Sequence, residues 1–209
     1  MADGPDHALH CPSCGAGLPR AFRHARLAAC AYCDSTVLLD DAGLRLAGSA
    51  GVMAETPSLL ALGRPFAHRA LKLLPVGHAR FSYEHGSWDE WWALDAEQGT
   101  GVWVSVDEGD IAVEEPLAVA ADGLPAFAAL EIGAAVELAG ERLIVTERGE
   151  AACEAVRGEL PEVLRPGDRF RYAHLSGPRG RLVTVEVGRD DERRCTQGRW
   201  LDPFEIRPA

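Results

Sequence analysis

The chain contains 209 residues, of which 32 are acidic and 21 are lysine or arginine, so its formal net charge at pH 7 is −11. An acidic surface repels the phosphate backbone, and this charge argues against nonspecific nucleic-acid binding by most of the chain. No uncharged apolar run is long enough for a membrane-spanning helix. Residues Met1 to Pro5 lack the basic and apolar parts of a secretion signal, so we expect a cytoplasmic protein.

The strongest chemical signal is a pair of CxxC motifs near the N-terminus. Cys11 and Cys14 form the first motif, and Cys30 and Cys33 form the second. Their separation lies within the spacing that is typical of a four-thiolate zinc site. Two residues between ligands let one tight turn aim both sulfurs at the same metal, and two such turns complete a tetrahedron. We therefore predict that these four cysteines bind one Zn²⁺ ion.

Each CxxC motif is followed by a residue that tolerates a left-handed backbone, Gly15 in the first and Asp34 in the second. Four protein thiolates leave no coordination position for water or substrate, which indicates structural rather than catalytic zinc. The alternatives are disulfides or a redox motif. A reducing compartment disfavours disulfides, and no βαβ pattern surrounds the motifs, so zinc remains the preferred interpretation.

The segment between the two motifs contains three arginines, Arg20, Arg23 and Arg26. One interpretation is that their positive charges are attracted to the negative zinc–tetrathiolate group. A second is that they contact an acidic partner. A third is that the ribbon uses them to bind nucleic acid, which would make that binding strongly salt-dependent.

The composition changes along the chain predict four parts. We expect a zinc ribbon at residues 1–40, a linker at 41–58, a first β unit at 59–120 and a second β unit at 121–209. The linker is rich in Gly, Ala and Ser, although a hairpin strand near Gly43 fits its sequence. Thr56 followed by Pro57 has the residue types that begin a helix, and predicts a short helical turn ending at Gly63.

From Phe66 onward, short runs alternate apolar and polar residues, with Gly, Pro and Asp between them. This pattern predicts a mainly all-β body, a barrel- or sandwich-like pseudo-repeat of two small antiparallel units. The expected strands are 67–74, 79–84, 88–94, 102–106 and 111–113 in the first unit. In the second unit they are 135–138, 142–147, 151–156, 169–172, 182–187 and 200–206.

Three of the five tryptophans lie between positions 88 and 92. On a strand, alternation places Trp88, Glu90 and Trp92 on one face and Asp89 and Trp91 on the other. The first set resembles an aromatic wall with a carboxylate, which suits a cationic ligand such as a polyamine. The alternative is that the tryptophans belong to the core and that Glu90 pairs with an arginine.

Acid–base catalysis requires two groups in convergent geometry. His85, Asp89 and Glu90 have suitable side chains, but neighbours on a strand point to opposite sides. The sequence contains no glycine-rich phosphate loop, no GxSxG and no HExxH motif. We therefore expect a protein without enzymatic activity and assign no catalytic residue.

Two cysteines lie outside the CxxC motifs. Cys153 alternates with apolar neighbours and is interpreted as a core residue. Cys195 follows Arg193 and Arg194, whose charges can lower the pKa of a thiol, although an ordinary thiol in a loop is the alternative.

Two segments of the body carry a family resemblance. The first begins at Gly86 as GSWDEWW and continues with Gly101-Val102-Trp103; the second includes GELP from Gly158 and PGD from Pro166. With a CPxCG ribbon in front, residues 59–206 resemble the bacterial domain of unknown function 4178. That resemblance carries no known catalytic activity. Its members are encoded near membrane-stress proteins, which implies a cytoplasmic accessory role.

These observations lead us to expect an adaptor that binds other proteins, including membrane-associated ones, in a bacterial membrane-stress system. The two alternatives are a sensor or enzyme for a small cation that uses the wall formed by Trp88, Glu90 and Trp92, and nucleic-acid binding through the ribbon.

Overall fold

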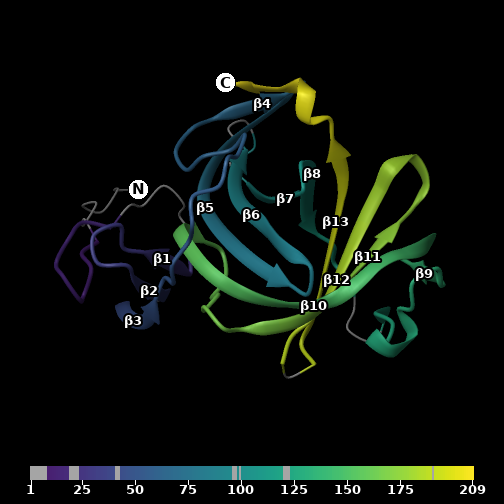
Figure 1. Cartoon of the computed structure of the whole chain (residues 1–209), viewed down its shortest axis with the longest axis horizontal. Helices are drawn as coiled ribbons and strands as arrows, with labels where there is room; N and C mark the ends of the chain where they lie inside the picture. Colours follow the sequence, from purple (N-terminus) through teal and green to yellow (C-terminus); the bar gives the residue numbers. More distant parts are fainter. Residues whose placement is uncertain are drawn as a thin grey trace, which may run out of the picture.

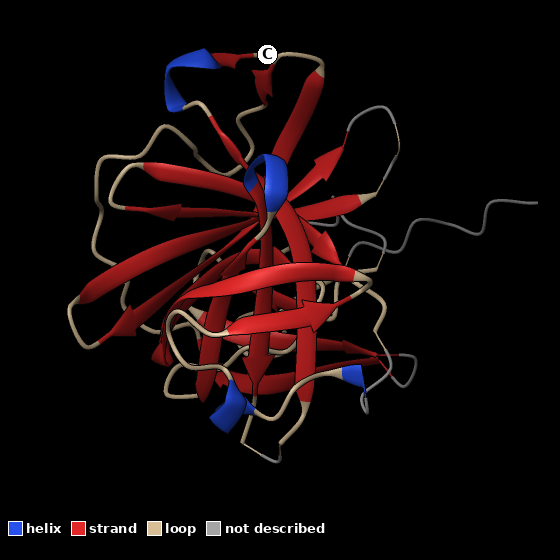
Figure 2. Ribbon diagram, turned by 90° about the vertical axis from the view of Figure 1, so that its right-hand side faces the viewer, coloured by secondary structure: helices blue, strands red, loops and turns tan. Residues whose placement is uncertain are grey.

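The computed structural model describes residues 9–18, 24–40, 43–95, 98, 100–119, 123–189 and 191–209. Within them nearly all regular structure is β, and the helices are single 3-10 turns (Figure 2). No helix in these residues has the length and apolarity needed to cross a bilayer. The mainly all-β fold that the sequence predicted is confirmed.

The first strands belong to the ribbon and its connection to the body: β1 (Leu27–Ala29), β2 (Ser35–Asp40) and β3 (Gly43–Ser49). The first half of the body contains β4 (Phe66–His68), β5 (Leu71–Tyr83), β6 (Gly86–Asp95), β7 (Gly101–Asp107) and β8 (Asp110–Pro116). The second half contains η2 (Phe127–Ala129), β9 (Ala135–Leu138), β10 (Glu141–Leu160), β11 (Arg169–Ser176), η3 (Pro178–Gly180), β12 (Arg181–Val187), β13 (Arg193–Leu201), η4 (Pro203–Glu205) and β14 (Ile206–Pro208).

Eight of these strands close into a ring, and all of their pairings are antiparallel. The order is β5-β6-β7-β8-β13-β12-β11-β10, and a pairing between β5 and β10 closes the circle (Figure 1). The closing strands approach each other closely at Gly77 and Gly158, where a Cβ on Gly158 would lie 2.1 Å from the carbonyl oxygen of Val76. Gly158 also has a positive φ of 68°, so only glycine fits this point of closure without strain.

Strands of both groups that the sequence placed in separate units form this single ring. β8 of the first group pairs with β13 of the second, and β5 pairs with β10. Outside the ring, β14 near the C-terminus pairs with β4. A small sheet with open edges exposes unpaired backbone groups, and closing the two halves on each other satisfies them.

Several expected strands have different bounds in the structure. The expected strands 142–147 and 151–156 form one continuous strand of 20 residues, β10, because a bulge between Val145 and Glu147 bends the strand instead of ending it. The expected strand 200–206 is divided by η4, where Asp202 accepts a hydrogen bond from the backbone N–H of Phe204. The expected helical turn at 56–63 does not form, because the Thr56 hydroxyl is bound by Arg80 instead of capping a helix.

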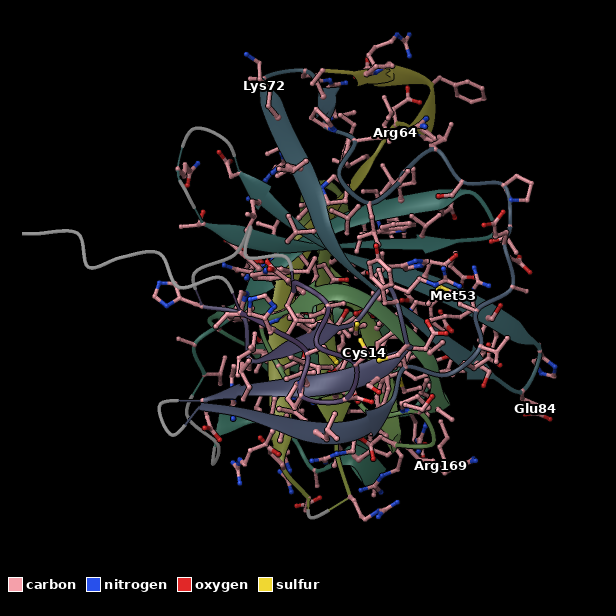
Figure 3. All side chains as sticks on the ribbon, turned by 90° about the vertical axis from the view of Figure 1, so that its left-hand side faces the viewer. Cys14, Met53, Arg64, Lys72, Glu84 and Arg169 are labelled. Carbon is pink, nitrogen blue, oxygen red and sulfur yellow. The ribbon has the colours of Figure 1, made fainter. Side chains whose placement is uncertain are left out.

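The ribbon packs directly against the ring. β1 pairs with the end of β10, with Leu27 opposite Leu160, and the backbone N–H of Arg26 donates to the Leu160 carbonyl (2.8 Å). Figure 3 views the molecule from this side and shows the purple and blue ribbon strands, with Cys14, in front of the green β10. The segment expected to be a linker holds β3, and beyond it Ala50 is buried and its carbonyl accepts from Val156 of β10.

Candidate functional site

The two CxxC motifs fold into matching turns. In the first, the N–H of Gly15 donates to the Cys11 carbonyl (2.8 Å); in the second, the N–H of Asp34 donates to the Cys30 carbonyl (3.0 Å). Gly15 and Asp34 have φ values of 76° and 52°, so both adopt the left-handed conformation that the sequence predicted. The two loops therefore present their cysteine pairs in the same way.

The four cysteine sulfurs form a compact cluster, with all four Sγ atoms within 4.8 Å of one another. Cys11 Sγ lies 3.7 Å from Cys33 Sγ, and Cys14 Sγ lies 3.7 Å from Cys30 Sγ. A tetrahedral Zn²⁺ with Zn–S bonds of about 2.3 Å separates its sulfurs by about 3.8 Å. The cluster thus has the ligand number, the ligand type and the spacing of a tetrathiolate metal centre, and the described cysteines are all free thiols.

Ser35 lies beside one ligand of this cluster. A hydrogen bond joins Cys33 Sγ and Ser35 Oγ (3.3 Å), and hydrogen bonding to Ser35 lowers the pKa of Cys33 to about 6. A lowered pKa favours the thiolate, which is the form that binds metal. Ser35 therefore favours the thiolate form of Cys33.

A second site lies in the ring, where residues of β6, β7, β8, β10, β11, β12 and β13 and of neighbouring loops line a cavity of about 860 Å³ that opens to solvent. Rings of eight strands have an interior wide enough to hold one small ligand. The volume also falls in the range of small-molecule sites. The size of the cavity thus suits the binding of a small ligand.

The inner face of β6 forms one wall of this cavity. Trp88, Glu90 and Trp92 all line it, as the alternation along the strand predicted. The ring of Trp92 meets that of Trp103 of β7 edge-on, with centroids 5.2 Å apart. Trp88 and Trp92 are buried core residues, as one alternative had it, and they also border the cavity. Binding of a cation by this wall stays a prediction.

Carboxylates dominate the cavity lining, which contains nine aspartates or glutamates against three arginines and one histidine. Glu90 accepts a hydrogen bond from the indole N–H of Trp88 (3.0 Å). Burial, opposed by that bond, raises the pKa of Glu90 to about 7, and burial together with the neighbouring Glu90 and Glu114 raises the pKa of Glu186 to about 8. These shifts report negative charges enclosed together without enough opposite charge.

Glu114 of β8 shows the same imbalance in its hydrogen bonds. It is only 6% exposed, and its two carboxylate oxygens accept from the hydroxyls of Ser105 (3.2 Å) and Thr196 (2.6 Å). Both donors are neutral. A buried carboxylate is costly unless a charge or several donors compensate it, so this face of the cavity favours a positively charged guest.

Glu147 connects two aromatic side chains of β11 at the cavity. It accepts a hydrogen bond from the Tyr172 hydroxyl (2.8 Å) and lies 3.2 Å from Nδ1 of His174. Burial lowers the pKa of His174, but its hydrogen bond to Glu147 and the charge of Glu114 outweigh burial and raise it overall. The contact with Glu147 therefore favours the positively charged form of His174.

Two polar atoms that border the cavity have no hydrogen-bond partner within the described part of the chain. They are the hydroxyl of Thr184, whose side chain is 7% exposed, and one carboxylate oxygen of Asp107. Buried polar atoms in native proteins nearly always have a partner. Both atoms are thus available to a ligand that donates hydrogen bonds.

The outer face of β6 has a different arrangement. Asp89 accepts two hydrogen bonds from Arg80, at 2.8 and 3.1 Å, and its Oδ1 lies 2.8 Å from Nε2 of His78. The His78 ring stacks on Trp91 with centroids 3.7 Å apart. Burial alone would raise the pKa of Asp89, but its bonds to His78 and Arg80 lower it overall. Both carboxylate oxygens of Asp89 thus have hydrogen-bond partners.

Arg80 also ties this outer cluster to the chain that follows the ribbon. It donates to the carbonyl of Ala54 (2.6 Å) and to the hydroxyl of Thr56 (2.8 Å). Arg157 similarly donates to the carbonyl of Met53 (2.9 Å). The cluster therefore holds the chain against the outside of the ring.

The structure answers the question of the remaining cysteines. Cys153 is 2% exposed and belongs to the core, as predicted. Cys195 is also buried, at 8% exposure, and lies in β13 rather than in a loop. Burial raises the pKa of Cys195 to about 11, so the suggestion that its arginine neighbours make it reactive is wrong. Arg20 and Arg23 lie outside the described residues, whereas Arg26 borders the ring cavity.

Sequence reasoning missed most of the cavity lining. Glu114, His174 and Glu186 come from three strands that are distant from Trp88 in the sequence. A signal was present, because Thr184 and Glu186 alternate with buried valines in β12. Alternation alone, however, does not say which polar faces meet.

The fold and the two sites define an all-β protein with a four-cysteine ribbon and an acidic cavity inside a ring of strands. Residues 74–203, more than half of the chain, match the model of the domain of unknown function DUF4178, and the chain belongs to this family. The matched region begins in β5 and includes all of β6 to β13, so it supplies most of the ring and its cavity. No curated protein and no solved structure matches the chain significantly.

Proposed function

We propose that this protein binds a small organic cation in the ring cavity and that the four cysteines hold a structural Zn²⁺ ion. The observation that carries the first part is the enclosure of Glu90, Glu114 and Glu186 in one cavity with too little opposite charge. A bound cation would supply the missing charge, and binding would be stronger in an enclosed site than in water.

The remaining cavity lining narrows the chemistry of this cation. The tryptophan faces at positions 88, 92 and 103 suit an alkyl chain or a cationic group. The Asp107 carboxylate oxygen needs a hydrogen-bond donor, and the Thr184 hydroxyl can accept a hydrogen bond as well as donate one. A ligand with N–H donors and more than one positive charge meets both requirements, as an aliphatic diamine or polyamine does. An anionic ligand would meet the same carboxylates and be repelled.

A titration followed by calorimetry and by tryptophan fluorescence tests this proposal. We expect spermidine and 1,4-diaminobutane to bind, and the neutral diol of the same length and an anion such as citrate not to bind. Glu114→Gln should weaken diamine binding about tenfold, since a charge-assisted hydrogen bond contributes about 1.5 kcal/mol or more.

Glu150→Gln is the matched control, because Glu150 is an exposed carboxylate of β10 that pairs with Arg169 away from the cavity lining. It should bind the diamine as the unmodified protein does. Equal loss in both variants would indicate a general charge effect instead of a site. Failure of every cation to bind the unmodified protein would refute the proposal.

The zinc part of the proposal rests on the sulfur geometry and on the absence of any open ligand position. We expect one Zn²⁺ per chain by elemental analysis of the purified protein. Cys14→Ser should abolish stoichiometric metal, whereas Cys153→Ser should retain it because Cys153 lies in the core of the body. Stoichiometric metal in the Cys14→Ser variant would refute a four-cysteine site.

A second candidate function is the adaptor role that the sequence predicted, with a protein partner in a membrane-stress system. One observation favours a partner: β3 ends the strand order, pairs with β2 alone among the described strands, and is mostly exposed. Such an edge can accept a strand from another protein. Replacing Leu46, which is 54% exposed on β3, with proline should abolish a strand-adding partner in a pull-down from the native bacterium.

A further inference from the structure

We infer that metal binding by the ribbon controls the ring cavity, because the ribbon builds and supports one end of the cavity wall. With the metal ion bound, the ribbon holds the end of β10 and Arg26 against the cavity. Without metal these contacts are released and the cavity opens. The inference rests on the proposed metal site, and its ligand readout rests on the proposed cation binding.

A short chain of backbone hydrogen bonds runs from the metal knuckle to the cavity wall. The N–H of Ala50 donates to the carbonyl of Asp34, the residue after the ligand Cys33 (2.6 Å). The carbonyl of Ala50 accepts from Val156 of β10 (2.8 Å). Val156 in turn pairs with Ala79, which pairs with Glu90 on the cavity wall.

Close packing reinforces this chain of bonds. A Cβ on Gly51 would lie 2.4 Å from the carbonyl oxygen of Glu154, so the segment after the ribbon runs directly against β10. Displacing Asp34 therefore affects β10 through both hydrogen bonds and packing.

The ribbon strand β1 and the cavity wall share a hydrophobic core. Leu27 of β1 is 1% exposed and belongs to the same buried cluster as Leu160, Trp88 and Trp92. β1 connects the two cysteine pairs, and its three residues are too few to remain ordered by themselves. Metal binding supplies the folding free energy of small cysteine modules. The place of Leu27 in the buried cluster that also contains the cavity tryptophans thus depends on the metal.

At the ribbon end, residues next to β1 and β10 also line the cavity. Arg26 lies just before β1, and residues 161–163 lie just after β10; all of them line the cavity although none belongs to a ring strand. Glu162 forms an ion pair with Arg194 of β13, which lies 4.0 Å from Glu186. Release of β10 from β1 would disturb this ion pair and thereby the charge balance of the cavity.

Hydrogen exchange read by mass spectrometry tests the inference on the full chain, with zinc bound and after removal by a chelator. We expect the peptide that covers residues 157–163 to exchange at least tenfold faster in the metal-free protein. Peptides from β7 and β8, on the other side of the ring, should change less than twofold. Acrylamide quenching of the tryptophans should rise about twofold, because Trp88 and Trp92 become accessible.

Faster exchange confined to the ribbon, with an unchanged 157–163 peptide, would overturn the inference. If metal removal unfolds the whole chain, the variant Leu27→Ala decides, since it keeps all four cysteines. It should retain one Zn²⁺ and still expose residues 157–163; protection equal to that of the unmodified protein would overturn the inference.

The last readout is the rate at which the diamine dissociates. We expect this rate to be at least tenfold higher for the metal-free protein than for the metal-bound protein. The proposed function and the inference fail separately in this design. Loss of protection at 157–163 without any diamine binding in either state would refute the proposed ligand and support metal control of the wall. Diamine binding with the same kinetics and the same exchange in both states would support the ligand and refute the control.

Discussion

The two faces of strand β6 carry adjacent carboxylates with opposite electrostatic environments. Asp89 points outward to Arg80 and His78, which hold its carboxylate, and its pKa is lowered. Glu90, the next residue, points into the cavity, accepts a hydrogen bond from a neutral indole, and has a raised pKa. The first carboxylate is satisfied within the fold, whereas the second is incompletely compensated.

This difference separates a structural group from a binding group. A buried ion pair with bidentate geometry stabilises the position of its neighbours, and here it holds the segment that follows the ribbon. A carboxylate that folding leaves uncompensated lowers stability, and proteins retain such groups where function requires them. The outer face of β6 therefore supports the fold, and the inner face carries the cation site that we propose.

The largest expected effect follows from removal of the outer carboxylate. Asp89→Ala leaves Arg80 buried without its charge partner, and we expect a loss of about 3–5 kcal/mol in the free energy of unfolding at pH 7, measured with urea. Because the pKa of Asp89 is lowered, its stabilisation is present above the unfolded value near 4 and is lost as the pH falls further. The difference between the two proteins should thus shrink in acid.

The control for Asp89 is Glu150→Ala, which breaks the exposed ion pair with Arg169. A surface pair contributes less than about 1 kcal/mol. Similar losses in both variants would contradict a special role for the outer cluster.

A smaller effect of opposite sign is expected on the inner face. The folded protein holds the Glu90 proton up to a pKa of about 7, whereas the unfolded chain releases it near 4.5. Stability therefore falls as the pH rises through that window. Glu90→Gln removes this cost while keeping an acceptor for Trp88. The free energy of unfolding of the variant, relative to that of the unmodified protein, should therefore rise by about 2 kcal/mol between pH 5 and pH 8. A constant difference across this range would contradict the raised pKa.

The smallest effect concerns Cys195, which borders the cavity but is buried. With a pKa of about 11, only about one thiol in a thousand is ionised at pH 8. Alkylation by iodoacetamide should be at least a hundredfold slower in the native protein than in urea, as measured by mass spectrometry. Cys195→Ala should change diamine affinity less than twofold; rapid native alkylation would instead show an activated thiol.

The sequence by itself determined the local features of both sites. Residue spacing and turn chemistry predicted the cysteine knuckles, including the left-handed residues Gly15 and Asp34, because each knuckle is a few residues long. Strand alternation predicted that Trp88, Glu90 and Trp92 share a face, because the side-chain period of two is a property of any strand.

Only the tertiary structure decided what these features face. Glu114, Glu186 and His174 join Glu90 because β5 pairs with β10 and β8 with β13, across long separations in the sequence. The ribbon likewise docks through the pairing of Leu27 with Leu160. Such pairings depend on the closure of the whole ring and on its packing, and no short segment contains that information, whereas alternation and turn chemistry are local properties of the chain.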